Sequence, residues 1–217
     1  MNKEKSAEFL QWASQERTRL AFENNVPILL MATLTALSII GVTVGYHRLN
    51  LSIPWFLLLV MVYLARYRLY LRFVESGAVG EQAANWRNKF LAGAAAAGVM
   101  WGIGLFIVFP ENSIALQMII MLTAFGIMGV TLVGYSSDVT AALLFNTPVA
   151  AILAIRLLTL DADHGLTLLL GLAILYSISV LLSRNLERFA MESLWVKYQN
   201  IGLAERLDSA QARLKAL

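Results

Sequence analysis

The chain has 217 residues, of which 59% are hydrophobic and only 14% charged, and its formal net charge is +3. Because soluble domains contain about 25% charged residues, this composition excludes an ordinary water-soluble domain. The absence of cysteine excludes disulfides and thiolate metal sites. The apolar residues occur in uninterrupted runs, which indicates that lipid is the main solvent of the protein.

Residues 1–25 are polar and charged, and they lack the apolar core of a cleavable signal peptide. We expect this segment to form a cytoplasmic amphipathic helix. Four of its apolar side chains are available to rest on the membrane: Phe9, Leu10, Trp12 and Leu20.

A helix that crosses the bilayer needs about 20 predominantly apolar residues. Six stretches meet this requirement: residues 27–46, 53–73, 90–109, 114–134, 139–159 and 165–184. The sequence therefore predicts an all-α, polytopic membrane protein whose six-helix transmembrane bundle occupies residues 26–184.

Lysine and arginine lie almost entirely on one side of these spans, before the first, between the second and third, and after the sixth. The opposite side has only Arg48 and Arg156. Because basic loops remain in the cytoplasm, we expect both termini to lie on the cytoplasmic side of a bacterial inner membrane. Topology thus explains the positive charge, and no nucleic-acid partner is expected.

Residues 185–217 follow a heptad pattern with spacings of three and four. The a and d positions of this seam are Leu186, Phe189, Ser193, Val196, Asn200, Leu203, Leu207, Ala210, Leu214 and Leu217. Asn200 is an a residue, where one buried amide favours a dimer and fixes the register. We therefore predict a parallel coiled coil between two copies, rather than a tail that folds back onto the membrane. Because the seam continues to the last residue, we expect the chain to be part of a longer protein.

Motifs for catalysis are missing from the sequence. It has no glycine-rich phosphate loop, no HExxH, no GxSxG and no pair of carboxylates within a span. We expect no enzymatic activity of this segment and no cofactor. The only histidines, His47 and His164, fall near the outer ends of the first and sixth spans. They are weak candidates to share a metal ion or to sense pH, and plain polar helix ends are the favoured interpretation.

Large amphipathic side chains reach similar depths in three spans: Tyr63, Trp101 and Tyr176. In the fifth span, Asn146 precedes Pro148, and a proline bends a helix. These groups are candidates to line a cavity for a small or lipophilic ligand. Mutual hydrogen bonding inside a packed core is the favoured alternative.

Two arginines fall inside the predicted spans, where charged residues are costly. Arg66 is expected to extend to the cytoplasmic interface. Arg156, near the outer end of the fifth span, is a candidate to bind an anionic group from outside. An ion pair within the protein is the favoured role of this arginine, with Glu111, Asp161 or Asp163 as its partner.

Small residues recur every four positions in the third span, at Ala94, Gly98 and Gly102. Such a stripe lets a neighbouring helix approach closely. Gly126 and Gly134 are expected to act similarly in the fourth span. Packing inside one subunit is favoured over a dimer seam.

Six spans, a basic N-terminal helix and a coiled exit resemble the MASE-type N-terminal sensor regions of bacterial diguanylate cyclases and membrane histidine kinases. The residues that suggest this are Trp86-Arg87-Asn88-Lys89-Phe90, Trp101-Gly102, Phe109-Pro110, and Asn146-Thr147-Pro148 through Arg156. The resemblance covers most of the chain. It implies that the spans perceive a signal and that the coil sets the pairing of a following GGDEF cyclase or, next, a kinase.

The sequence thus predicts a membrane-embedded sensory and dimerisation module that signals through its coiled coil to a downstream output domain. Its expected partners are the lipid bilayer, a second copy of the chain and an unidentified small or lipophilic ligand. Two alternatives stay open, namely a small transporter or channel subunit and a membrane anchor without a ligand.

Overall fold

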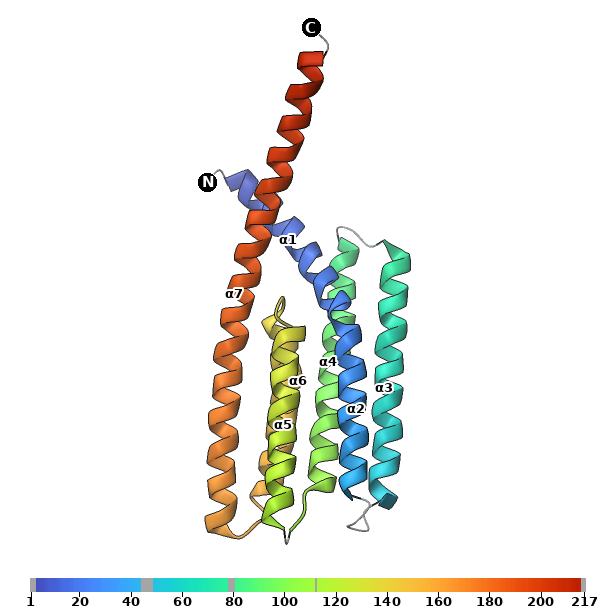
Figure 1. The fold of residues 1–217 in the computed structure, drawn as a ribbon, viewed down its shortest axis with the longest axis vertical. Helices are drawn as coiled ribbons and strands as arrows, with labels where there is room; N and C mark the ends of the chain where they lie inside the picture. The colour runs from blue at the N-terminus through green and yellow to red at the C-terminus, as the bar shows by residue number, and fades with distance from the viewer. Residues whose placement is uncertain (1–2, 44–48, 78–80, 112, 216–217) are drawn as a thin grey trace.

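The computed structural model describes residues 3–43, 49–77, 81–111 and 113–215. This part of the chain is built from α-helices, without a strand (Figure 1). The helices are α1 (Lys3–Glu23), α2 (Asn25–Thr43), α3 (Leu49–Ser76), α4 (Glu81–Val108), α5 (Ile114–Gly134), α6 (Val139–Leu157) and α7 (Ala162–Lys215).

The described residues contain six helical segments that are long and apolar enough to cross a membrane. One runs from Glu8 to Gly41 over α1 and α2, and the others coincide with α3 to α7. Large apolar side chains remain exposed around the bundle, for example Leu57, Leu122 and Leu170, as expected where lipid is the solvent. The prediction of an all-helical chain with six helices able to span a membrane is confirmed, and these helices indicate a multi-pass membrane protein.

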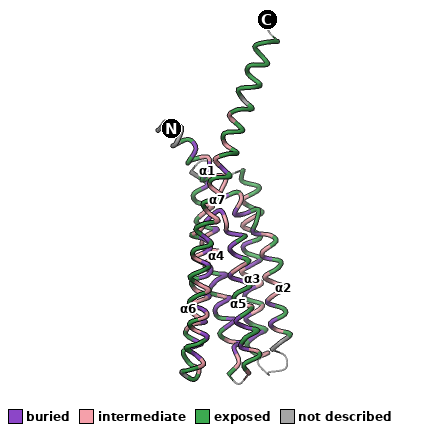
Figure 2. Tube along the Cα trace, turned by 60° about the vertical axis from the view of Figure 1, so that its left-hand side comes forward, coloured by how far each residue is buried: buried purple, intermediate pink, exposed green. Residues whose placement is uncertain are grey.

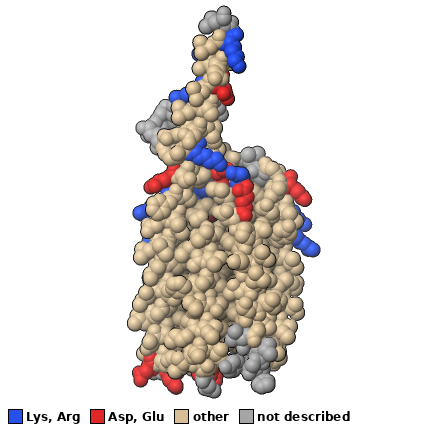
Figure 3. Space-filling model, viewed as in Figure 1, with Lys and Arg blue, Asp and Glu red and all other residues tan. Residues whose placement is uncertain are grey.

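Both termini emerge from one end of the bundle, where α2 and α4 begin and α3 and α5 end (Figure 1). We call this the basic end, because the Lys and Arg side chains visible in Figure 3 gather there, with Asp and Glu among them. At the opposite end, the charged side chains of described residues that this view shows are acidic. We call it the acidic end; there α6 ends at Leu157 and α7 begins at Ala162.

The small residues of α4 allow it to lie directly against α6. A Cβ atom on Gly98 would stand 2.3 Å from the carbonyl oxygen of Phe145, and one on Gly102 would stand 2.9 Å from that of Pro148. The stripe therefore serves packing inside one chain, as favoured. In α5 the expectation is right for Gly134, which abuts Ile28, but wrong for Gly126, whose Cβ would meet nothing within 4 Å.

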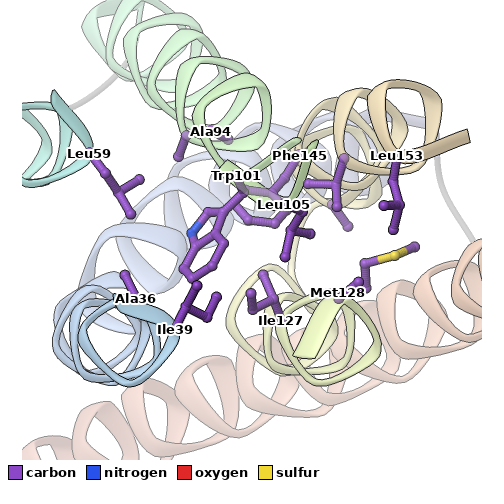
Figure 4. Packing of buried hydrophobic residues seen from close by; sticks show 14 of the residues in the cluster. Ala36, Ile39, Leu59, Ala94, Trp101, Leu105, Ile127, Met128, Phe145 and Leu153 are labelled. Carbon is purple, nitrogen blue, oxygen red and sulfur yellow. The ribbon is translucent and has the colours of Figure 1, made fainter. Parts of the chain in front are cut away.

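Trp101 of α4 stands at the centre of the bundle and is fully buried. Figure 4 shows its indole reaching toward the space between α2 and α5, near Ala36, Ile39 and Ile127. Around it, buried side chains of α1 to α7 form one apolar core. The close α4–α6 contact lies on one side of α4, and the Trp101 indole points toward α2 and α5.

The N-terminal helix lies across α7 (Figure 1). Phe9 and Ala13 of α1 are buried against Leu194 of α7. The Phe9 ring meets the Trp195 ring edge-on, with 4.7 Å between centroids. The predicted helix is present, but Phe9 contacts protein rather than being free to rest on a membrane, whereas Leu10 is exposed.

Candidate functional site

The sixth span continues without interruption into the exit helix, because α7 is one helix of 54 residues. At 1.5 Å per residue, its length is roughly 80 Å, far more than a bilayer requires. Its last part projects beyond the bundle and is exposed on all sides (Figure 2). This is the segment for which the sequence predicts a coiled coil.

The predicted a/d seam is an exposed apolar stripe on this single chain. Five of its large side chains are each more than half exposed: Phe189, Val196, Leu203, Leu207 and Leu214. Asn200 is also exposed, and Leu186 is half-buried. Because leucines that face water are unfavourable, this stripe is a surface that a partner would stabilise.

Another face of α7 is already occupied by α1. Leu194 is buried there, with Met191, Trp195 and Tyr198 packed around it. These four residues lie outside the predicted seam, so α1 covers one apolar face and leaves the a/d face open.

Ion pairs join α1 to α7 where the helix leaves the bundle. Arg17 forms an ion pair with Glu187. Its Nε also donates a hydrogen bond of 2.6 Å to the carbonyl oxygen of Ser137, in the turn between α5 and α6. Farther along, Lys197 Nζ lies 2.6 Å from a carboxylate oxygen of Glu16. We call the group Arg17, Glu187, Ser137, Glu16 and Lys197 the exit junction.

The exit junction was not predicted from the sequence. Its residues lie 120 to 181 positions apart in the chain, so no local spacing identifies them. The only feature of the sequence that pointed to the exit junction was the excess of charged residues next to the sixth span.

The mid-depth residues form separate hydrogen-bonded sets rather than one site. Trp101 Nε1 donates a hydrogen bond to the hydroxyl of Tyr63, which joins α4 to α3. The Tyr176 and Thr147 hydroxyls lie 2.7 Å apart and join α7 to α6. These residues therefore hydrogen-bond within the core, as the favoured interpretation of the sequence predicts, although Tyr63 also lines a cavity.

Asn146 links three spans at a buried position. Its Nδ2 donates to the Ser179 hydroxyl of α7 at 2.8 Å, and its Oδ1 accepts from Thr131 of α5 at 2.9 Å. A buried amide with both ends satisfied fixes the relative position of the helices that it joins. Asn146 therefore positions α7 against α5 and α6.

Arg156 forms the expected ion pair at the acidic end. Its Nη2 lies 2.9 Å from Glu111 Oε1 and donates a hydrogen bond to the carbonyl oxygen of Phe109. Its Nη1 donates to the Thr159 hydroxyl at 2.9 Å. Glu111 is therefore the partner among the three acidic candidates, and the arginine holds the α4–α5 turn against α6.

Of the two histidines, the structure describes His164. His164 Nε2 is hydrogen-bonded to Gln117 Oε1, and Gln117 Nε2 donates to the carbonyl oxygen of Pro110. His47 lies outside the described residues, so the pair remains a prediction.

Arg66 does not extend outward as expected, since only 4% of its surface is exposed. Its Nη2 donates a hydrogen bond of 2.6 Å to Oδ1 of Asn25, at the start of α2. The guanidinium lies 5.5 Å from the ring centroid of Phe90 and 5.6 Å from that of Tyr135. These partners hold the arginine inside the protein.

No family model, curated protein or solved structure matches this chain.

Proposed function

We propose that the chain is a membrane-embedded sensory and dimerisation module. In this proposal, the spans respond to a signal, and α7 pairs with the α7 of a second copy as a parallel coiled coil. The coil transmits the change to a downstream output domain, for which a GGDEF diguanylate cyclase is the first candidate and a histidine kinase the next. The uncovered heptad stripe on a helix continuous with the sixth span is the observation that supports this proposal.

The proposed orientation places the basic end and both termini in the cytoplasm of a bacterial inner membrane. The Lys and Arg side chains visible at this end support it, because basic segments are retained on the cytoplasmic side. Arg156, at the other end, is buried and paired with Glu111. It therefore contributes little to the charge of that surface.

The exit junction is the proposed route from the spans to the coil. Arg17 contacts both Glu187 on α7 and the α5–α6 turn, so a shift of that turn would act on α7 where the helix leaves the bundle. A coil with two packings could then change population. A signal that bound both packings equally would shift nothing.

The mass of the purified full chain in phosphatidylcholine nanodiscs tests the pairing. We expect a dimer for the unmodified chain. Leu207→Glu places a charge in the seam and removes a leucine whose burial is worth about 1.5–3 kcal/mol, so we expect a monomer. Ala212→Glu, five residues later on the outer face, introduces the same charge and should remain dimeric.

Either of two results would contradict the proposal. The unmodified chain could be monomeric at every concentration, or the two glutamate variants could dissociate equally. The second result would mean that charge, and not the seam, controls the association.

A further inference from the structure

A cavity of about 230 Å³ lies between α2, α3 and α5 in the half of the bundle nearer the basic end. Its walls include Ile28 and Ala32 of α2, Ile127 and Gly126 of α5, and Phe145 of α6. Met31 and Leu122 line it as well, and both are more than half exposed on the outside of the bundle. The cavity therefore opens sideways, onto the surface that faces lipid.

A second hollow continues this cavity toward the acidic end, along the seam between α2 and α5. Both are lined by Met31, Thr35, Thr123 and Val130, and the second extends to Ile39. From Ile28 to Ile39, the combined groove follows α2 for roughly 16 Å at 1.5 Å per residue. We call the two together the α2–α5 groove.

The walls of the α2–α5 groove have little capacity to hydrogen-bond a ligand along their length. The hydroxyls of Thr35, Ser38 and Thr123 donate to carbonyl oxygens of their own helices, at 2.9, 3.0 and 2.8 Å. A hydrocarbon chain would contact such walls without leaving a polar group unpaired.

The end of the groove nearest the basic end is polar and has groups that can hydrogen-bond a ligand. Tyr135 is only 1% exposed, and its hydroxyl has no hydrogen-bond partner among the residues that the structure describes. Arg66 lines the cavity beside it, and the amide oxygen of Asn25 is its hydrogen-bond partner within the described part of the chain. No carboxylate among the described residues neutralises this guanidinium, although buried charges are normally paired.

We propose that the α2–α5 groove binds a long-chain fatty acid. The carboxylate would accept hydrogen bonds from the Arg66 guanidinium and the Tyr135 hydroxyl, and the acyl chain would lie along α2 and α5. An arginine can bind a carboxylate through two parallel hydrogen bonds, and here the bound anion also neutralises the buried charge. The groove is a single path between α2 and α5, so it suits one acyl chain rather than the two chains of a diacyl phospholipid.

This inference goes beyond the proposed function and does not depend on it. Fatty-acid binding depends on the spans and is measured as bound palmitate, whereas pairing depends on α7 and is measured as the mass of the complex. A failure of one therefore leaves the other standing.

The test is saturable binding of tritiated palmitate to the full chain in phosphatidylcholine nanodiscs. Arg66→Gln should weaken binding at least tenfold, because hydrogen bonds to charged groups are the stronger ones. Gly126→Leu fills the cavity while leaving Arg66 and Tyr135 unchanged, and it should abolish binding. Gly129→Leu is the matched control, since its Cβ also meets nothing within 4 Å but lies on a different hollow, between α5 and α7.

Competitors identify the chemistry of the ligand. Unlabelled palmitate should displace the probe, whereas methyl palmitate, with the same chain and no charge, should compete at least tenfold less well. Equal competition by the ester, equal binding by the Gly126→Leu and Gly129→Leu variants, or no saturable binding would overturn the proposal. Displacement by an equal mole fraction of phosphatidylglycerol would assign the groove to membrane phospholipid and would also overturn it.

Discussion

Replacing Gly98 by alanine tests the close packing of α4 on α6. The new Cβ would lie 2.3 Å from the carbonyl oxygen of Phe145 and 2.8 Å from its Cα, both of which are backbone atoms. Relieving the closest contact requires the helices to separate by about 1 Å, the difference between 2.3 Å and the 3.4 Å of ordinary contact. A gap of about 0.5–1 Å forfeits a quarter to a half of the dispersion energy at each contact, and overpacking costs about 1–3 kcal/mol.

Helix propensity opposes this loss, because alanine is favoured over glycine by about 1 kcal/mol in a helix. Gly129→Ala has the same gain and no steric cost, since nothing lies within 4 Å of its Cβ. The propensity terms cancel between the two variants, so we expect Gly98→Ala to be less stable than Gly129→Ala by about 1–3 kcal/mol. The assay is the free energy of unfolding from titration with sodium dodecyl sulfate in mixed micelles. Equal stability of the two variants would refute the packing argument.

Two further predictions concern the coil and the tyrosines. Asn200→Leu should strengthen the dimer but loosen its register. A fused output domain should then still pair but respond less to signals. An unchanged response would show that Asn200 does not set the register. Tyr63→Phe should lower the free energy of unfolding by about 1–3 kcal/mol, because it leaves the buried Trp101 Nε1 without an acceptor. Tyr135→Phe removes a hydroxyl that has no partner in the described part of the chain, so it should leave the stability equal or higher and weaken palmitate binding. Equal losses in both tyrosine variants would contradict the hydrogen-bond assignments.

The positions of the spans were predictable because each segment must by itself be long and apolar enough to cross the hydrocarbon layer. The predicted fourth span, residues 114–134, has the same bounds as α5, Ile114–Gly134. The fifth, 139–159, differs from α6 by two residues at its end. The close approach at Gly98 followed from a spacing within one helix, and the Arg156–Glu111 ion pair from the charges near one bundle end.

Features that depend on which helices become neighbours were not predictable. Gly126 and Gly134 look alike in the sequence, yet one borders a cavity and the other abuts Ile28. Arg66 was expected to extend toward water, because its partner Asn25, 41 residues earlier at the start of α2, lies beside it only in the folded chain. Phe9 was expected at the membrane, because only the folded chain brings the aromatic side chains of α7 beside it.

Pairing of the exit helices through the a/d seam is the central claim, and disulfide cross-linking in membranes tests it most directly. The chain has no cysteine, so a single introduced cysteine reports its own position. Ala210 occupies a d position and Ala212 the outer f position, and both are exposed in one copy of the chain. Because a disulfide requires Cβ atoms about 3.5–4.5 Å apart, Ala210→Cys should form covalent dimers on mild oxidation and Ala212→Cys should not. Equal cross-linking at both positions, or none at Ala210→Cys, would contradict the coiled coil.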